Sequence, residues 1–562
     1  MKDYFYPSKE KIIFSVLALV LFVFPLVRLV MLSVFSEDGT LTFSQYAYFI
    51  SDDRAIEAVK NTLYISITAS LISAFCGVTT AFLVGYTNIH FKNIIEVLVL
   101  LPFVIPAYII TLSWTGLMGS GSWFNQMLIF CGFPPINLFS IKGIIAMLGI
   151  CHMSVVHVTV VHMLRKVPLE AGWAARASGC PLWQSLWRVD LPIVLPAIAG
   201  GTVLAFLADV DNFAVPAFLG ISSNITVLST YIYEKIISFG PDSFTYGAVL
   251  SVILSLIALT GAILSRVLVP KSNALESTKE NSSVRVHFPP KVRVVIEVLM
   301  VGLLTLFSIV PSIYMAISAL LKGYTFTLNP TFFTLDNYLF VFNNEGVLQA
   351  ALNSLFMAGI AALGCLVAGT LTAYMIVRCH SKTASILSTC ASVTYSVPGI
   401  VLALAMIFYW AQPLPGIKTG LYGTYTSIIL GYITRYMILQ INNSSAAFMS
   451  VAAVSEQAAV ISGSNKFTLW VKIIVPQLVV PALAGTFFVF LSAFSELTLS
   501  SVMSSASTKT IGLAIFNLQQ AGDYSLAAAL STVIIIFISI IYCTQKFVRH
   551  FCLGGRRYES DY

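Results

Sequence analysis

Two stretches of the sequence repeat one pattern: EAGWAARASGCPLWQSLWRVDLPIVLP at residues 170–196 and EQAAVISGSNKFTLWVKIIVPQLVVP at residues 456–481. In each, an alanine-rich segment reaches a glycine, Gly179 or Gly463, and a proline, Pro192 or Pro476, follows thirteen residues later. Glycine permits a tight turn, and proline suits the first turn of a helix, where a missing N–H costs little. The pattern predicts a helix, a turn and a second helix, built twice in one chain.

The composition around these stretches is that of a membrane protein. Of the 562 residues, 57% are hydrophobic and 10% are charged, whereas a soluble domain carries about 25% charged residues. A soluble enzyme is therefore excluded. The formal charge of +7 is spread between apolar runs instead of forming one basic stripe, which also excludes nucleic acid as a partner. The nine cysteines show no C-x-x-C spacing and form no extracellular framework.

Apolar runs long enough to cross a bilayer recur along the whole chain. We place the N-terminus in the cytoplasm because most Lys and Arg residues then fall on inner segments, and both termini are cytoplasmic with an even number of spans. The lipid bilayer of a bacterial cytoplasmic (inner) membrane is the expected location. The predicted spans of this all-α, multi-pass chain are 12–34, 60–86, 93–117, 143–163, 190–219, 244–269, 293–321, 351–378, 384–410, 422–442, 473–503 and 524–547.

The second half of the chain repeats the first. Asn61, Gly77 and Pro106 have counterparts 292 residues later, and Gly179 and Pro192 have counterparts 284 residues later. We therefore predict a first six-span unit at 1–269 with its inner loop at 168–190, a cytoplasmic linker at 270–292, and a second six-span unit at 293–562 with its inner loop at 452–472. Six spans in each unit make the two repeats parallel, with a pathway expected between them.

The two inner loops resemble the signature of the membrane permease subunit of binding-protein-dependent ABC importers, in which E-A-A is followed by three residues, a glycine and a distant Leu-Pro. The resemblance covers nearly the whole chain and implies the type I importer permease fold. The acidic position departs from the signature, since Trp173 and Gln457 stand there and the acids come earlier. The residues expected to couple to the ATPase are Glu170, Trp173, Ala174, Ala175, Gly179, Pro192, Glu456, Gln457, Ala458, Ala459, Gly463 and Pro476.

This resemblance implies that each loop is a coupling helix that docks on a cytoplasmic ATPase subunit. The chain contains no Gly-Lys dipeptide, so it has no phosphate-binding Walker loop and is not itself an enzyme. The implied partners are two copies of an ABC ATPase, which hold the ATP and Mg, and an extracytoplasmic solute-binding protein. We expect no cofactor or metal in this chain.

Polar residues inside the spans are candidates for the translocation pathway, because ionisable groups are costly in a membrane. The fifth span carries Asp209, Asp211 and Asn212, and Asn212 is the repeat counterpart of Glu496. At 100° per residue, Asp211 lies about 200° from Asp209, so the two acids face different surroundings. Pro216 is expected to end or kink this span. Arg435 is a deep cation that would suit an anionic solute.

His152, His157 and His162 recur every five residues in the fourth span. Neighbours lie about 140° apart on a helix, which favours interhelical hydrogen bonds over chelation of one metal. A fused chain of two six-span units is similar to the branch that serves ferric iron, thiamine and phosphonates. Ferric iron is the leading prediction, because the stretch DNFAVPAFLG at residues 211–220 is similar to the iron-type members of the family. Carboxylates such as Asp211 and Glu496 are hard donors that would suit this ion. Thiamine, phosphonate or another small phosphorylated organic is the alternative solute, and an ion-driven secondary transporter is the alternative mechanism.

Overall fold

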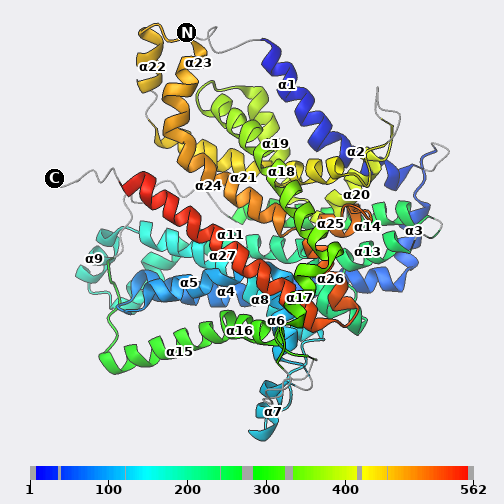
Figure 1. The fold of residues 1–562 in the computed structure, drawn as a ribbon. Helices are drawn as coiled ribbons and strands as arrows, with labels where there is room; N and C mark the ends of the chain where they lie inside the picture. Colours follow the sequence, from blue (N-terminus) through cyan, green and yellow to red (C-terminus); the bar gives the residue numbers. More distant parts are fainter. Residues whose placement is uncertain are drawn as a thin grey trace. The chain divides into compact units, whose positions relative to one another are not determined.

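The computed structural model describes residues 8–35, 40–119, 122–238, 240, 242–268, 283–322, 333–413, 420–451 and 454–554. Within these ranges every regular element is a helix, and β pairing is limited to three isolated bridges. Figure 1 shows the helices in chain order. The predicted all-α class is confirmed. The linker residues 270–282 and the first two residues of the predicted loop 452–472 lie outside the described ranges.

The elements of the first repeat include a π-helical turn before two of its long helices and a 3-10 turn, which carry the label η. Their bounds are α1 (Ser8–Ala18), η2 (Leu19–Val23), α2 (Phe24–Val34), α3 (Ser44–Ser51), α4 (Asp53–Tyr86), α5 (Lys92–Val104), α6 (Ala107–Leu117), α7 (Trp123–Phe130), α8 (Ile141–Lys166), α9 (Leu169–Ala177), α10 (Leu182–Ser185), η3 (Leu186–Asp190), α11 (Leu191–Asp211), α12 (Ala214–Gly220), η4 (Ile221–Ser223), α13 (Leu228–Ile237) and α14 (Ser243–Leu268).

The second repeat has a matching series with one π-helical turn, η6. Its elements are α15 (Pro290–Ser308), α16 (Val310–Ser318), α17 (Asp336–Asn343), α18 (Glu345–Val377), α19 (Lys382–Ser396), α20 (Gly399–Trp410), α21 (Tyr425–Ser450), α22 (Val454–Ile461), α23 (Lys466–Leu469), η6 (Trp470–Ile474), α24 (Val475–Phe494), α25 (Thr498–Met503), α26 (Ile511–Gln520) and α27 (Tyr524–Gly554).

Nine helices in the described part of the chain are long and apolar enough to cross a membrane, and four more bent helix pairs pass the same test when taken together. The resulting range of nine to thirteen spans includes the predicted twelve. The predicted spans 93–117 and 384–410 are not straight, because α5 meets α6 at 102° and α19 meets α20 at 115°. The breaks fall at Pro106 and Pro398, and the residues before them, Ile105 and Val397, are extended, as the proline ring requires.

The chain forms two compact units whose composition differs from the two sequence repeats. One unit contains residues 44–340 and 516–532, and the other contains residues 1–43, 341–515 and 533–562. In the first unit α15 and α16, which open the second repeat, pack against α5 and α6 of the first repeat. In the other unit α1 and α2 pack against α19 and α20. The opening helices of each repeat therefore pack in the compact unit that the other repeat mainly forms.

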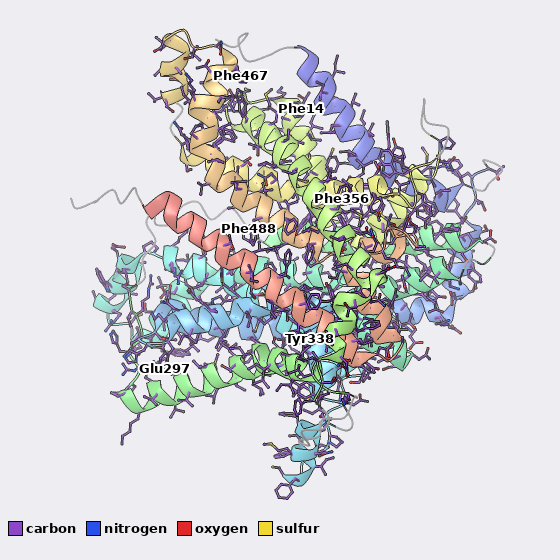
Figure 2. The ribbon with its side chains drawn as sticks, in the orientation of Figure 1. Phe14, Glu297, Tyr338, Phe356, Phe467 and Phe488 are labelled. Atoms are coloured by element: carbon purple, nitrogen blue, oxygen red, sulfur yellow. The ribbon has the colours of Figure 1, made fainter. Side chains whose placement is uncertain are left out.

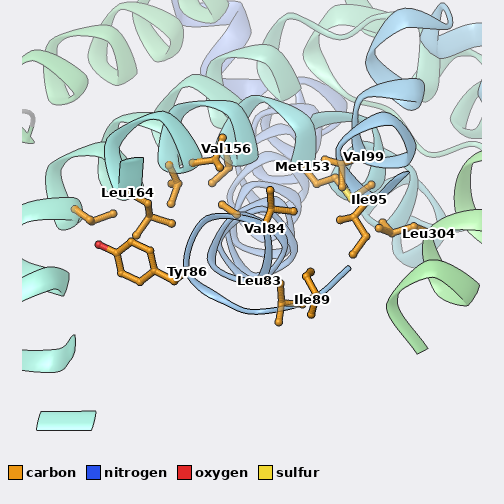
Figure 3. Packing of buried hydrophobic residues seen from close by; sticks show 14 of the residues in the cluster. Leu83, Val84, Tyr86, Ile89, Ile95, Val99, Met153, Val156, Leu164 and Leu304 are labelled. Atoms are coloured by element: carbon orange, nitrogen blue, oxygen red, sulfur yellow. The ribbon is translucent and has the colours of Figure 1, made fainter. Parts of the chain in front are cut away.

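Each unit is built on three long helices in mutual contact. These are α4, α8 and α11 in one unit and their repeat counterparts α18, α21 and α24 in the other. Figure 3 shows Val84 and Val156 within the buried cluster beside α4, with Leu304 of α15 packing at its edge. Helix packing in a membrane depends on close van der Waals contact, since lipid tails are as apolar as the core.

Glycine provides that close contact where α4 meets α8. A Cβ added at Gly77 would lie 2.7 Å from the carbonyl oxygen of Met153 and 2.7 Å from the Cβ of Val156. Its repeat counterpart, Gly369, approaches Gln440 of α21 in the same way, with an added Cβ 2.8 Å from Cγ. The repeated glycines therefore allow a close helix contact at equivalent places in both units.

Candidate functional site

The two predicted bent elements are present, and we call them the first elbow (α9, α10 and η3) and the second elbow (α22, α23 and η6). Each short helix ends in a glycine with positive φ: +87° at Gly179 and +79° at Gly463. An added Cβ would meet no atom within 4 Å at either glycine, so the backbone conformation, and not lack of space, calls for glycine.

The hydrogen bonds at the two turns are the same. The N–H of Cys180 donates to the carbonyl of Ala175, and that of Gly179 donates to Arg176. In the second elbow Ser464 donates to Ala459 and Gly463 donates to Val460. This pair of bonds is the Schellman motif, which ends a helix and reverses the chain. The duplicated sequence therefore folds into duplicated geometry at atomic level.

The short helices of both elbows expose large hydrophobic side chains. Trp173 is 59% exposed and Ile461 is 80% exposed, and Phe467 of α23, labelled in Figure 2, is 76% exposed. Gly179 and Gly463 are also exposed. Aromatic and aliphatic side chains held outward on a short, well-terminated helix provide a surface suited to contact with a partner. The predicted coupling residues that share this exposure are Glu170, Trp173, Ala174, Gln457 and Ala458.

A π-helical turn connects each elbow to the long helix that follows. The N–H of Leu191 donates to Leu186 across η3, and the N–H of Val475 donates to Trp470 across η6. Pro192 and Pro476 follow two residues after the end of each π turn. A proline lacks an N–H and its ring collides with the carbonyl four residues earlier, and the wider π turn relieves that collision.

An arginine fixes the start of each elbow, and sequence analysis did not identify either residue. In the second repeat, Arg378 donates from Nε to Glu456 at 2.8 Å and from Nη2 to the carbonyl of Val451 at 2.7 Å. In the first repeat, Arg285 donates to the carboxylate of Asp190 and to the carbonyl of Val167. Val167 and Val451 are repeat counterparts.

These two arginines come from different parts of the chain. Arg378 is the residue that ends α18, whereas its repeat counterpart at the end of α4 is Tyr86. Tyr86 donates its hydroxyl to Asp190 at 3.1 Å, and the Arg285 guanidinium lies 4.4 Å from its ring centre. Arg285 lies within the predicted linker 270–292, and its own N–H donates to the carbonyl of Tyr86. The two arginines are equivalent only in what they bind: the carbonyls of Val167 and Val451 are repeat counterparts. The positions of the arginines in the sequence do not indicate this.

The displaced acid of the second elbow makes an ion pair within the chain. Glu456 is buried against Arg378, while Glu170 is exposed in the first turn of α9, where a carboxylate complements the helix dipole. Gln457 stands at the acidic position of the signature, and the acid is displaced to Glu456. At that position it is paired with a cation, Arg378. Ala459 is buried beside it, and Ala175 is half-buried in the first elbow.

Asn212 and Glu496, which the sequence pairs, have the same structural role. The side chain of Asn212 accepts from the N–H of Val215 at 2.9 Å, and Glu496 accepts from Leu499 at 3.1 Å. Each therefore caps the short helix, α12 or α25, that follows the break in the fifth span of its repeat. The break comes at Asn212, and Pro216 lies in the first turn of α12.

In each unit a buried polar pair connects the helix of the fourth predicted span with the end of the fifth. His152 of α8 contacts Asp209 of α11 through Nδ1 and Oδ1 at 2.5 Å. Tyr436 of α21, the repeat counterpart of His152, donates its hydroxyl to Glu496. His157 also pairs across helices, with the hydroxyl of Thr80 at 2.9 Å. The predicted interhelical role of these two histidines is confirmed.

Arg435 lies beside the Tyr436–Glu496 pair. Its Nε is 3.9 Å from Glu496, its Nη1 is 3.5 Å from the carbonyl of Val397, and both charged side chains are buried. The guanidinium also packs against Gly399, where α20 begins. The carbonyl released by the Pro398 break therefore faces a cation. Asp211, by contrast, is partly exposed at the end of α11.

No group of three His, Cys, Asp or Glu side chains able to hold a metal occurs in the part of the chain that the structure describes. The structure instead contains two elbows with exposed side chains. A π turn joins each elbow to a long helix that ends at a buried polar pair. These features are those of a membrane permease subunit.

Comparison with known proteins identifies the family. The profile described as binding-protein-dependent transport system inner membrane component matches twice, at residues 75–273 and 362–551. The chain belongs to this family and is a fused double permease of ABC importers, a transport component and not an enzyme. As predicted, it is a multi-pass membrane protein.

Three relatives show the range of this similarity. The ferric transport system permease protein FbpB of Actinobacillus pleuropneumoniae is 23% identical, with 94% of this chain and 76% of that protein aligned. The Fe(3+)-transport system permease protein FbpB 2 of Haemophilus influenzae is 19% identical, with 88% and 90% aligned. The sulfate transport system permease protein CysT of Escherichia coli is 25% identical, with 38% of this chain and 77% of that protein aligned.

Proposed function

We propose that this permease imports ferric iron. The observation that carries the proposal is the extent of similarity: the ferric permeases align with both repeats, whereas the sulfate permease aligns with little more than one third of the chain. The alternatives thiamine, phosphonate and other phosphorylated organics rest on no relative described above. An ion-driven secondary transporter is disfavoured by the duplicated elbows, which such a carrier has no reason to possess.

The charges inside the helices also favour a cation over an anion as cargo. Arg435 is the buried cation that an anionic solute would need, but its Nε lies 3.9 Å from the carboxylate of Glu496. The opposite charges compensate one another in a region where an uncompensated charge is expensive. Sulfate or a phosphonate would have to compete with Glu496 for the guanidinium. The buried charges of this unit therefore do not form an anion site.

Of the five predicted pathway residues, Asp211 is proposed to contact iron. Asp209 is bound to His152, Asn212 and Glu496 cap helices, and Arg435 lies beside Glu496. Asp211 is partly exposed, and a carboxylate oxygen is a hard donor suited to brief contact with Fe³⁺. The other four are proposed to position the helices around the pathway.

The proposed partners follow from the family. An extracytoplasmic binding protein delivers the solute, and two copies of a cytoplasmic ATPase bind the elbows and hydrolyse ATP with Mg²⁺. Closure of the ATPase pair moves the elbows and changes the packing of the long helices, so that the permease alternates between outward-open and inward-open forms. Both chain termini are proposed to lie in the cytoplasm.

Uptake by proteoliposomes tests the proposal. The permease, reconstituted with its ATPase and binding protein, is supplied with radioactive Fe³⁺, sulfate or spermidine. ATP-dependent accumulation of iron alone is expected, and accumulation of sulfate or spermidine instead would overturn the ferric assignment. Asp211→Asn is expected to lower iron uptake at least tenfold with unchanged thermal stability, while Glu496→Gln should lower thermal stability as well as uptake. Full iron uptake by Asp211→Asn would remove Asp211 from the pathway.

A further inference from the structure

Each unit has an apolar groove beside its elbow. One groove, of about 250 Å³, lies between α4 and the η3–α11 segment. The other, of about 380 Å³, lies between α18 and the η6–α24 segment. Six lining positions are shared by the repeats: those of Val78, Leu186, Asp190, Leu191, Val194 and Ile198, whose counterparts line the second groove. The grooves are therefore the same feature, formed twice.

Neither groove presents a negative charge. Asp190 is the acid in the wall of the first groove, and its carboxylate is bound by Arg285 and by the hydroxyl of Tyr86. Its counterpart in the second groove is Ile474. An apolar molecule or an anion can therefore approach both walls without electrostatic repulsion.

A cation lies on the π turn next to each groove. Arg188 on η3 and Lys472 on η6 are exposed and are repeat counterparts, 284 residues apart. In the described residues no ion pair involves either side chain. Long basic side chains can extend along apolar surface and hold their charge at the polar edge of a membrane. A positive charge at the same place in both repeats suggests an anionic occupant.

Exposed apolar side chains surround the grooves, as expected for a surface that faces lipid. Beside the grooves, Phe75 of α4 is 75% exposed and its counterpart Val367 of α18 is 69% exposed, and Phe488 projects from α24 in Figure 2. Trp183 and Trp187, at the elbow end of the first groove, are exposed and pack edge to face. Tryptophan concentrates at the level of the lipid headgroups, so the elbow end of the groove is its polar end.

The length of the groove matches one leaflet. Its lining runs along the helix from Trp183 to Ile198, which spans about 22 Å at roughly 1.5 Å per residue. Half of a bilayer of about 40–45 Å, headgroup regions included, is about 20–22 Å, so the groove can hold an acyl chain from the headgroup level to the middle of the bilayer.

We propose that each groove binds one acyl chain of an anionic phospholipid, with the headgroup phosphate held by Arg188 in one repeat and by Lys472 in the other. Guanidinium and ammonium groups both donate charge-assisted hydrogen bonds to phosphate. The apolar walls would accept any acyl chain, so the two cations supply the preference for an anionic headgroup over a zwitterionic one. The permease thus carries two equivalent lipid sites, each next to an elbow.

Native mass spectrometry of the full chain tests this proposal. The protein in detergent is supplied with equal amounts of palmitoyl-oleoyl phosphatidylglycerol and phosphatidylcholine, and the retained lipids are counted. Two phosphatidylglycerol molecules are expected, each with about a fivefold preference over phosphatidylcholine, since one surface cation gives about that factor. The double variant Arg188→Gln/Lys472→Gln should lose the preference. The control Lys142→Gln/Lys322→Gln removes the same charge from exposed lysines away from the grooves and should keep it.

Three results would overturn the proposal. These are equal retention of both lipids by the natural chain, an unchanged preference in Arg188→Gln/Lys472→Gln, or an equal loss in the control. Brominated lipids test the groove itself, because bromine in an acyl chain quenches nearby tryptophan. Brominated phosphatidylglycerol should quench Trp183, Trp187 and Trp470 more than brominated phosphatidylcholine does. If neither lipid quenches them while the ATPase subunit shields them, the groove is a protein interface and the lipid sites do not exist.

Discussion

At the scale of single residues, Arg378 and Arg285 show how a duplicated protein keeps a contact while its sequence changes. Each caps the carbonyl that precedes an elbow and each binds a nearby carboxylate, but they come from positions that are not equivalent. The two carbonyls are repeat counterparts, but the two arginines are not. We infer that the elbow requires a cation at the carbonyl that precedes it, whichever part of the chain supplies that cation. An elbow whose start is fixed in this way is suited to pass a movement on to the long helix that follows it.

Replacing Arg378 by glutamine should destabilise the unit that contains the second elbow by about 3 kcal/mol, because it leaves Glu456 buried without its cation. The double variant Arg378→Gln/Glu456→Gln should recover part of this loss. Thermal unfolding in detergent measures both. The control Arg176→Gln removes an exposed cation from the first elbow and should change stability by less than about 0.5 kcal/mol. Equal effects of Arg378→Gln and Arg176→Gln would show that the ion pair contributes nothing.

Asp52, which precedes α4, gives a pH-dependent contribution to stability. Its burial alone would raise the pKa of the carboxyl, but hydrogen bonds donated by Tyr231 at 2.6 Å and Tyr246 at 2.7 Å outweigh burial and lower the pKa below 3.8. A carboxyl whose pKa is lower in the folded state stabilises the protein above its unfolded pKa and loses that contribution as the pH falls through the folded value.

The natural chain should therefore be more stable than Asp52→Asn by a constant amount between pH 7 and about pH 5, and the difference should shrink as the pH falls below about 4. Asparagine keeps the oxygen that accepts from the N–H of Arg54, but it removes the charge and replaces the oxygen that accepts from Tyr231 and Tyr246 with an NH₂ donor. Unfolding midpoints of the two proteins across this range provide the measurement. A difference that persists unchanged at pH 2.5 would contradict the assigned role of the carboxylate.

Some of these residues could be predicted from sequence and others could not. The offset of 284 paired Asn212 with Glu496, and the structure gives both the same capping role. The same offset pairs His152 with Tyr436. The sequence contains this pairing, but recognising it as a shared role requires knowing that histidine and tyrosine can each bind a carboxylate at this place. Arg285 could not be found, because it lies in the predicted linker and its partners are set by how the linker folds back on the first repeat.

At the scale of elements, one close helix contact in each unit depends on a repeated glycine. Gly77 of α4 and Gly369 of α18 allow the neighbouring helix backbone or side chain to approach to a distance that a Cβ would prevent. Gly359 also lies in α18, but an added Cβ there would meet no atom within 4 Å. The chain therefore offers a matched comparison between a packed glycine and an open one.

Gly77→Ala should lower the free energy of unfolding by about 1–3 kcal/mol, because the new methyl group collides with the carbonyl of Met153 and with Val156. Gly359→Ala should be neutral or slightly stabilising, since alanine favours the helix and meets nothing. Unfolding in detergent compares the two variants. If Gly77→Ala is as stable as Gly359→Ala, α4 and α8 are not held at the close distance that the structure shows.

The elements themselves were predictable to different degrees. Apolar runs indicated the long helices, and the glycine–proline spacing indicated both elbows. The spans at 93–117 and 384–410 were expected to be continuous, although Pro106 and Pro398 were already known to repeat. A proline after an extended residue can end a helix or only bend it, and the surrounding helices decide which. The π turns before Pro192 and Pro476 depend on the same neighbours.

At the scale of the whole molecule, the exchanged opening helices could not be read from the sequence. The repeats divide the chain near residue 280, but α1 and α2 belong to the compact unit of the second repeat, and α15 and α16 to that of the first. Hydrophobic periodicity does not state which apolar helix is the neighbour of which, because every apolar face is compatible with lipid or with another helix. The family, by contrast, was predictable from two loops.

The account depends on one claim, that an external ATPase drives this permease through both elbows. Cross-linking tests this claim most directly. The natural cysteines are replaced by serine or alanine, and a single cysteine is placed at Trp173 or Gln457. This protein is then treated with a short bifunctional reagent in the presence of the ATPase. Each position should link to one ATPase subunit, in membranes open to the cytoplasmic side only, and a chain with both cysteines should link to two. Labelling of either position from the opposite side of the membrane, or no link at either elbow while ATP-dependent uptake continues, would contradict the account.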